Sequence, residues 1–431
     1  DLEGESWSPI WYFEGELGGQ GHKISNFTMS NGSHFSGFFA SINHGGVVKN
    51  VTFADFSMTV NTEEAFSAGV IAGTNSGTIE NCIVEDAVIS YSYSKKYNAS
   101  TTSTISLGGC VGQNTGFISD CVANINIICL IKIANTAGGY SPSQFTNWNN
   151  IGGIAGTNNG SLVKNHSANI ISVSGTVDGA QAQNFYYCAS VSRIGGAVGH
   201  NFGSVSECTG KDMISYSFNQ YSKVKIIDIH AGGLVGVNEG NIENCVALGQ
   251  ISDSTSNTVS KIYIGGFVGH SLSGTIKNCY AQSALNQNVS VRGIDEERIG
   301  GFAGYNQATI SNCYADSTVK TQISTGVGGF VGRNATGGSI SKCITFGSLE
   351  TVTNSNVGYF VGVAESGSSL FKCYYDSSMT VTYAYGLTEG GTAETAETLI
   401  SQAFLIDKLS WSKEIWTFAD GKKPTLNFEN E

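Results

Sequence analysis

The stretch GGLVGVNEGNIENCVA, which begins at Gly232, recurs twice in close succession. It returns as GGFVGHSLSGTIKNCYA from Gly265 and as GGFAGYNQATISNCYA from Gly300. Weaker copies extend in both directions, giving ten units with start-to-start spacings of 28 to 44 residues. The other seven units begin at Ser36, Ala68, Gly108, Gly152, Gly195, Gly328 and Val357. A period of this length is typical of repeat architectures rather than of one globular domain.

Each unit predicts short strands joined by tight turns. The apolar run after the glycines predicts one strand, and the N-x-G that follows predicts a turn in which Asn or Gly adopts a positive φ. The alternation in the next segment places Ile276 and Asn278 on one face and Cys279 on the other. Strands this short cannot bury a core alone, but stacked coils can. We therefore expect an all-β fold, a parallel β-solenoid (β-helix) of about ten coils.

The composition agrees with a solenoid and excludes other classes. The 431 residues include 56 Gly, 3 Pro and 13% charged residues, against the ~25% charged residues that are usual in soluble domains. Pro is scarce where nearly every strand has neighbours on both sides, because it removes a ladder hydrogen bond. The 40% hydrophobic content argues against disorder, and the net charge of −12 without a basic block argues against nucleic-acid binding. No apolar run has transmembrane length. The start at Asp1 is typical of a processed or excised fragment.

The units resemble the GLUG motif of bacterial surface adhesins and of accessory regions of secreted peptidases. The resemblance rests on GG-x-[VA]-G-x-N-x-G-x-[IV]-x-N-C and covers residues 36–376. The segment from Phe13 to Met29 resembles the opening coil of such arrays. CYYDSS from Cys373 and the final WTFADGKKPTLNF resemble the closing segment. The resemblance implies a right-handed β-solenoid, a secreted or cell-surface location and no particular reaction.

The two ends predict caps, which divides the chain into an opening coil at 1–35, repeats at 36–376 and a C-terminal cap at 377–431. Residues 393–411 form the one helix-like stretch, with an apolar stripe of Leu399, Ala403, Phe404 and Ile406. We expect this helix to pack over the last coil, because an open sheet edge invites pairing. We expect the N-terminal aromatic residues to cap the other end, namely Trp7, Trp11 and Phe13.

The longer units between Ala68 and Gly232 contain aromatic inserts. Exposed Tyr and Trp side chains are typical of recognition surfaces for glycans or proteins. The alternative is that these stretches are ordinary strands with one buried aromatic face. The candidate ligand-binding residues are Tyr91, Tyr93, Trp148, Tyr186, Tyr187, Tyr216 and Tyr221.

Eight of the 11 cysteines fall at one repeat position, so stacked coils predict a structural Cys ladder. Neighbouring coils bring Cα atoms within disulfide range, but parallel Cβ vectors do not converge. We therefore favour buried free thiols over pairing between coils, and both over metal binding, because no C-x-x-C or H-x-x-x-H spacing occurs. The ladder residues are Cys82, Cys121, Cys208, Cys245, Cys279, Cys313, Cys343 and Cys373, whereas Cys110, Cys129 and Cys188 lie off it.

Asparagine recurs at the N-x-G turn, where stacked amides can hydrogen-bond along the rod. This structural Asn ladder comprises Asn75, Asn114, Asn158, Asn201, Asn238, Asn306 and Asn334. Eight N-x-S/T sequons, a number expected by chance, mark candidate N-glycosylation sites in a eukaryotic secretory pathway. They lie at Asn26, Asn31, Asn50, Asn98, Asn159, Asn165, Asn288 and Asn334.

We find no candidate catalytic residue, cofactor motif or metal site. The densest acidic group, Asp295 to Glu297 beside Arg292 and Arg298, predicts a solvated loop with local ion pairs. His200 and His270 share a repeat position, but the intervening units place them too far apart for a joint site. The acidic residues are scattered along the chain, without the paired carboxylates that polysaccharide hydrolysis needs.

The sequence therefore favours a non-enzymatic, extracellular β-solenoid. It would serve as an adhesin or as a building block of a surface filament or stalk. Its partners would be further copies of itself, or a glycan or protein ligand, without nucleic acid. One alternative is an accessory region of a larger secreted peptidase or glycan-active enzyme. A polysaccharide-degrading β-helix enzyme is a weaker alternative.

Overall fold

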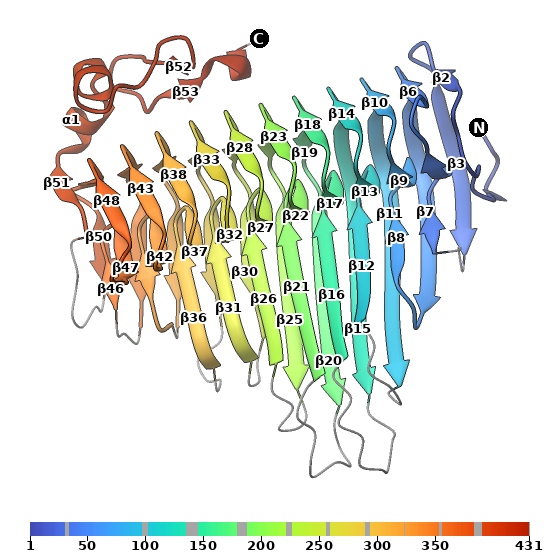
Figure 1. Ribbon diagram of the computed structural model, residues 1–431, viewed down its shortest axis with the longest axis horizontal. Helices are drawn as coiled ribbons and strands as arrows, with labels where there is room; N and C mark the ends of the chain where they lie inside the picture. Colours follow the sequence, from blue (N-terminus) through green and yellow to red (C-terminus); the bar gives the residue numbers. More distant parts are fainter. Residues whose placement is uncertain are drawn as a thin grey trace.

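The chain folds into a parallel β-solenoid of ten coils, as the repeats predict (Figure 1). The computed structural model describes residues 1–30, 34–96, 102–134, 145–178, 188–220, 226–255, 259–288, 294–322, 324–352, 356–382 and 390–430. Each coil passes through four parallel sheets, which we number sheet 1 to sheet 4 in the order in which the chain reaches them. Strands of neighbouring coils pair in register, so each repeat position forms a column along the rod.

Sheets 1 and 2 each contain ten strands and meet at the glycine pair of the repeat. Sheet 1 comprises β4 (Phe35–Ser36), β8 (Phe66–Ala68), β12 (Thr102–Gly108), β16 (Phe145–Gly152), β21 (Cys188–Gly195), β26 (Ile226–Gly232), β31 (Val259–Gly265), β36 (Ile294–Gly300), β41 (Val327–Gly328) and β46 (Val357–Gly358). Sheet 2 comprises β5 (Phe39–Ile42), β9 (Ala72–Asn75), β13 (Val111–Asn114), β17 (Ala155–Asn158), β22 (Val198–Asn201), β27 (Val235–Asn238), β32 (Val268–Ser271), β37 (Ala303–Asn306), β42 (Val331–Asn334) and β47 (Val361–Ala364).

Sheet 3 contains eleven short strands, one from the opening coil and one from each of the ten units. They are β2 (Glu16–Gly18), β6 (Val47–Lys49), β10 (Thr78–Glu80), β14 (Phe117–Ser119), β18 (Ser161–Val163), β23 (Ser204–Ser206), β28 (Asn241–Glu243), β33 (Thr275–Lys277), β38 (Thr309–Ser311), β43 (Ser339–Ser341) and β48 (Ser369–Phe371).

Sheet 4 is the broadest sheet, and from the fourth coil onward each coil contributes two strands to it. Its strands are β1 (Glu5–Ser6), β3 (Lys23–Ser30), β7 (Thr52–Thr62), β11 (Ile83–Lys96), β15 (Val122–Ala134), β19 (His166–Ser167), β20 (Ile170–Asp178), β24 (Thr209–Gly210), β25 (Met213–Gln220), β29 (Val246–Ala247), β30 (Gln250–Asp253), β34 (Tyr280–Ala281), β35 (Ala284–Gln287), β39 (Tyr314–Ala315), β40 (Thr318–Thr321), β44 (Ile344–Thr345), β45 (Ser348–Thr351), β49 (Tyr374–Asp376), β50 (Thr380–Thr382) and β51 (Thr392–Glu394).

The corner between sheets 3 and 4 is formed by one residue with a left-handed backbone. Asn278 has a φ of 53°, and the residue at this position has a positive φ in all ten coils. This conformation turns the chain, so Ile276 and Cys279 both point into the core and are fully buried. The predicted alternation, which placed Cys279 on the face opposite Ile276, is therefore wrong. The Asn of the N-C pair is a corner residue, and Asn tolerates this region better than most residues.

Glycines in the repeat allow close approach between coils. A Cβ on Gly266 would lie 2.0 Å from the carbonyl oxygen of Gly301 in the next coil. The glycine of the N-x-G turn is required for the same close approach, because a Cβ on Gly240 would lie 2.0 Å from the carbonyl oxygen of Gly203. Neither Gly240 nor the preceding Asn238 has a positive φ, so the predicted conformation is wrong for this turn, whereas Gly45 in the first coil has a φ of 88°.

The core is a set of apolar columns that follow the rod. Phe267, Phe302, Phe330 and Phe360 stack with ring centroids 4.7 to 4.8 Å apart. At the N-terminal end Trp7 stacks on Phe38 at 4.4 Å and Phe13 packs against Phe39. Trp11 remains 49% exposed, so it adds little to this end.

The C-terminal segment lies along the flank of the rod (Figure 1). The single helix predicted over 393–411 is interrupted: α1 (Ala396–Ile400) is followed by a π-helix, η1 (Phe404–Lys408). The antiparallel strands β52 (Trp416–Thr417) and β53 (Thr425–Leu426) and the 3-10 helix η2 (Asn427–Asn430) complete it.

This segment, which we call the strap (residues 395–430), covers an apolar column on the outer side of sheet 4. Phe404 packs edge-on against Tyr374 of the last coil, at 4.9 Å. Farther along, Tyr314 donates to the carbonyl oxygen of Pro424 and Tyr280 donates to Glu429. The prediction that the helix packs over the last coil is therefore corrected, because the strap runs back over the flanks of several coils.

Candidate functional site

Side chains that point outward from sheets 1 and 2 meet in the angle between the two sheets. From sheet 1 comes the residue two positions before the glycine pair, for example Arg193. From sheet 2 comes the residue just before the Asn of the G-x-V-G-x-N segment, for example His200. In the second to fourth coils these residues are polar and uncharged, as in the 2.9 Å contact between Ser106 and Thr157. Between the fifth and the ninth coil most of them are large, although Val237 and Gly326 occupy two of the positions. We call the large residues the corner cluster: Arg193, His200, His230, Tyr263, His270, Arg298, Tyr305 and Arg333.

The first part of the corner cluster is a chain of hydrogen bonds that joins Arg193, His200 and Glu239. The guanidinium of Arg193 lies 2.7 Å from Nδ1 of His200, and Nε2 of His200 lies 2.9 Å from Oε1 of Glu239. A guanidinium can only donate, so Nδ1 accepts and the proton of the neutral ring sits on Nε2, facing Glu239. Burial, followed by the charge of Arg193, lowers the pKa of His200 to about 2, and the ring is neutral at physiological pH.

The middle of the corner cluster is a stack of aromatic rings. His230 lies parallel to Tyr263 at 5.0 Å and edge-on to His270 at 5.1 Å, and Tyr263 stacks on Tyr305 at 4.7 Å. The prediction that His200 and His270 lie too far apart for a joint site is wrong. A single coil separates their strands, and His230 from that coil contacts His270 and is the register partner of Arg193, which binds His200. Burial lowers the pKa of His270 to about 4 and that of His230 as well.

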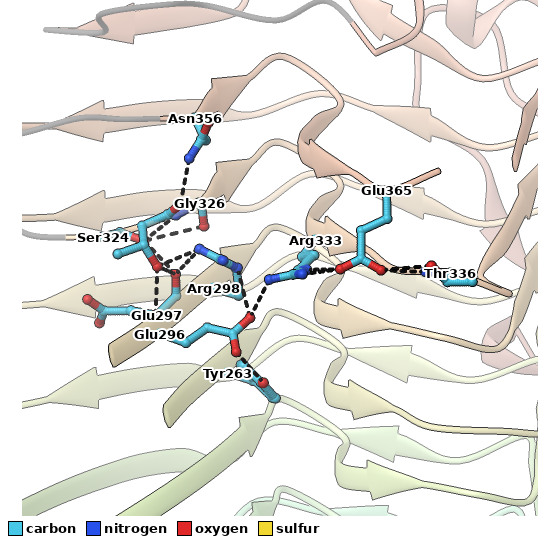
Figure 2. A network of polar contacts seen from close by, with 11 residues as sticks. Tyr263, Glu296, Glu297, Arg298, Ser324, Gly326, Arg333, Thr336, Asn356 and Glu365 are labelled. Carbon is cyan, nitrogen blue, oxygen red and sulfur yellow. Dashed lines mark hydrogen bonds and ion pairs between the residues drawn. The ribbon is translucent and has the colours of Figure 1, made fainter. Parts of the chain in front are cut away.

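The last part is an ion-pair network around Glu296 (Figure 2). Its carboxylate accepts from Tyr263 at 3.1 Å and pairs with Arg333 at 2.8 Å and Arg298 at 3.3 Å. Arg333 also binds Glu365, which in turn accepts from the backbone and hydroxyl of Thr336. These hydrogen bonds, with that of Thr336 the largest contribution, lower the pKa of Glu365.

The acidic group Asp295 to Glu297 therefore does not form the solvated loop that its composition predicts. It lies in strand β36, where Glu297 points inward and is fully buried, while Glu296 and Arg298 point outward into the corner cluster. The local ion pairs were correctly predicted, but they join three coils. Arg292 lies outside the described residues.

The predicted aromatic ligand-binding residues are mostly not available for recognition. Tyr91, Tyr93 and Tyr216 point inward from sheet 4 and lie in the core with at most 2% exposure. The prediction that they form a ligand-binding surface is therefore wrong. Trp148 is half-buried and lies over the guanidinium of Arg193, 4.1 Å from Cζ to the ring centroid. Tyr186, Tyr187 and Tyr221 lie outside the described residues.

The eight ladder cysteines form one interior column, together with Asn165 in the fourth coil. All eight are buried free thiols, as are Cys110 and Cys129, whereas nothing is described for the side chain of Cys188. The sulfur of Cys279 accepts from the backbone N–H of Cys245 at 3.4 Å, and Cys313 accepts likewise from Cys279. The thiols therefore bond to the neighbouring coil as weak acceptors.

The asparagines of the N-x-G turn form a second interior column. Side-chain amides of Asn75, Asn114, Asn158, Asn201 and Asn238 are joined at 2.8 Å, and Asn306 donates to Asn334 at 2.9 Å. Ser271 interrupts the column between these two runs. A third column, which the repeat pattern did not predict, lies at the left-handed corner. In it Asn278 donates to Asn244, and Asn312 donates to Asn278, both at 3.2 Å.

The sequons differ in exposure. Asn26, Asn159 and Asn288 are exposed, and Asn50 is half-buried. Asn165 and Asn334 are buried in the columns described above, so a glycan there is incompatible with the folded coil. Asn31 and Asn98 lie outside the described residues.

Among the described residues, no three His, Cys, Asp or Glu side chains are grouped so that they could hold a metal ion. In the same part of the chain no helix has the length and apolarity needed to cross a membrane.

Comparison with known proteins supports the resemblance drawn from the motif. Residues 228–252, 261–286 and 295–320 match the family model of the GLUG motif, so the chain carries GLUG repeats. A segment of 70 residues, 16% of this chain, is 37% identical to halomucin from Haloquadratum walsbyi and covers 1% of that protein. A segment of 90 residues, 20% of this chain, is 32% identical to a "Putative Gly-rich membrane protein" of Evansella cellulosilytica and covers 10% of it.

One solved structure, a "putative immunoglobulin A1 protease" from Bacteroides ovatus, aligns with 95% of this chain and 87% of its own. The sequence identity is 14% and the TM-score is 0.27.

Proposed function

We propose that this chain is a non-enzymatic structural or adhesive module that acts outside the cell or at its surface. The observation that carries the proposal is the stacking of ten coils in register, with polar columns that bond coil to coil over most of the rod. Such a solenoid is a stiff spacer that presents long lateral faces to partners. The GLUG repeats and the relative named as a membrane protein support the surface location.

The contacts of the corner cluster also support a role without catalysis. Hydrolysis of a glycan typically needs one carboxyl group to protonate the leaving group and a second to activate water or attack. Here Glu296 is held by two arginines, and Glu365 by Arg333 and Thr336. These contacts hold neighbouring coils together and engage the carboxylates that a reaction would require.

Location and turnover test this proposal separately. Antibodies against the purified chain should label intact cells that express it, and staining that appears only after permeabilisation would contradict a surface role. The chain, incubated with soluble and insoluble polysaccharides and with proteins, should release neither reducing ends nor new amino groups. Steady release that follows the chain through purification would show that it is an enzyme.

A further inference from the structure

The outer face of sheet 4 carries a contiguous apolar patch. Ile128, Ile170 and Met213 are 47%, 44% and 51% exposed. Ile170 and Met213 are register partners on neighbouring strands. Ile128 lies diagonally beside Ile170, two residues beyond the register partner of Ile170 on β15. Diagonal neighbours of this kind lie within side-chain contact, so the three side chains form one patch in the third to fifth coils.

Two rows of outward side chains cross this patch and are almost free of charge. The row through Ile170 comprises Thr28, Ser57, Val88, Asn126, Ile170, Met213, Gln250, Ala284, Thr318, Ser348 and Thr380. The row through Ile128 comprises Ser30, Thr59, Ser90, Ile128, Ser172, Ser215, Ser252, Asn286, Lys320, Glu350 and Thr382. Its two charges, Lys320 and Glu350, pair with each other at 3.0 Å.

We propose that this face pairs with the same face of a second copy of the chain, so that two rods lie side by side. Charge-poor surfaces with an apolar centre are typical of protein interfaces. A face without net charge meets its own copy without repulsion, and a two-fold axis places the patch against itself. A basic or acidic partner would find almost no complementary charge in either row.

The size of the face is sufficient for a stable dimer. Strands lie ~4.8 Å apart and outward side chains ~6.6 Å apart along a strand, so each covers roughly 30 Å². The two rows therefore cover roughly 700 Å², close to the ~800 Å² per partner of a standard interface. Face-to-face sheets pack about 10 Å apart, a distance that the side chains of Ile128, Ile170 and Met213 can fill.

Sedimentation velocity of the full chain tests the pairing. Between about 1 and 100 µM, which spans binding free energies of roughly −8 to −5 kcal/mol, the mass should rise from 45.3 kDa toward twice that value. The double variant Ile170→Lys and Met213→Lys should stay monomeric, with dimerisation weakened at least about tenfold, because like charges would face each other. Leu272→Lys is the matched control, since Leu272 is 38% exposed on another face. It should dimerise like the wild type.

Unchanged circular dichroism and melting temperature of the variants show that the fold is intact. A wild-type chain that remains monomeric at 100 µM, or a Leu272→Lys variant that is as monomeric as the double variant, would overturn the proposal. Loss of binding to an insoluble polysaccharide in the double variant, with a monomeric wild type, would assign the face to another partner and also overturn it. The inference rests on the proposed structural role, but a monomeric chain at the cell surface would leave that role standing.

Discussion

At the scale of single residues, the left-handed corner between sheets 3 and 4 decides which side chains reach the core. Its ten occupants include five Asn, at positions 50, 81, 244, 278 and 312, and three Lys, at positions 164, 342 and 372. Asn can stabilise the positive φ and also bond to the coil below it, whereas Lys only tolerates the conformation. The amide oxygen of Asn312 is buried without a partner, and Lys342 follows it in the column.

Lys342→Asn should therefore stabilise the protein by about 1 kcal/mol. The new amide would relieve the left-handed strain and donate to the oxygen of Asn312, as Asn312 already donates to Asn278. Chemical denaturation measures the gain. Lys342→Gly is the control, because glycine also relieves the strain of the positive φ but has no side-chain amide to donate to Asn312. Equal stability of the two variants would show that the column contributes nothing.

Asp212 is a buried carboxyl that links the fourth and fifth coils. It accepts from the hydroxyl of Ser167 at 2.6 Å and from the backbone and side chain of Asn169 at 2.8 Å. Burial raises its pKa to about 7, and these hydrogen bonds oppose the rise. Because the folded pKa lies above the unfolded value, its contribution to stability is complete below pH ~4 and is lost as the pH rises through about 7.

Asp212→Asn should remove this dependence. The variant should be more stable than the wild type at pH 8, where the wild type must keep a charge buried, and the advantage should vanish toward pH 4. Urea midpoints of both chains across this range measure the difference. An advantage that does not change with pH would mean that Asp212 does not titrate in this range.

At the scale of elements, the strap is the part of the molecule that departs most from the repeat. It is held by its own tryptophans: Trp416 is 1% exposed and stacks on Trp411 at 4.6 Å, and Trp411 donates to the backbone of Lys342. Among the described residues, its contacts with the rod lie on the outer side of sheet 4 and at the adjoining corner. The strap can therefore open locally while the sheets beneath it stay formed.

Trp416→Ala should loosen the strap without unfolding the rod. The loss of a buried Trp costs about 3 to 5 kcal/mol, and hydrogen exchange should accelerate in residues 395–430 but not in sheets 1 and 2. Trp11→Ala, at a side chain that is 49% exposed, is the control and should change neither. Faster exchange throughout the chain would show that the strap and rod fold as one unit.

At the scale of the whole molecule, each coil contacts mainly its two neighbours. The stability of a solenoid is then the sum of coil and interface contributions, and damage weakens nearby coils first. The phenylalanine column shows this geometry, since Phe302 touches Phe267 in the coil before it and Phe330 in the coil after it.

Phe302→Ala should cost about 3 to 5 kcal/mol, and the effect should decline with distance along the rod. Hydrogen exchange should rise most in the coils of Phe267, Phe302 and Phe330 and least in the coils before residue 110. Phe202→Ala, at a ring that is 45% exposed, serves as the comparison and should have a small effect. A uniform rise in exchange along the chain would mean that the solenoid unfolds all at once.

The repeat predicted the fold because equivalent positions of successive units stack in one column, and these positions can be read from the order of residues within each unit. It placed Asn238 beside Asn201 and Cys279 beside Cys245 without any knowledge of the angle between sheets. It failed where that angle matters. Whether His230 reaches His270 depends on how sheets 1 and 2 meet, and the inward direction of Cys279 depends on a backbone conformation that alternation does not encode. The prediction of a loop at Glu297 was also wrong, because a run of charged residues is typical of solvent-exposed loops, whereas here it lies in a strand.

The direction of the backbone hydrogen bonds has a mechanical consequence. Strands run across the rod, so the bonds between coils run along it and successive interfaces are in series. Tension along the rod axis therefore loads every interface equally, and the weakest opens first, one coil at a time. Force applied sideways is shared by the many bonds of the loaded coils at once. A tether built on this plan would lengthen stepwise under a steady pull and would absorb energy with each coil released.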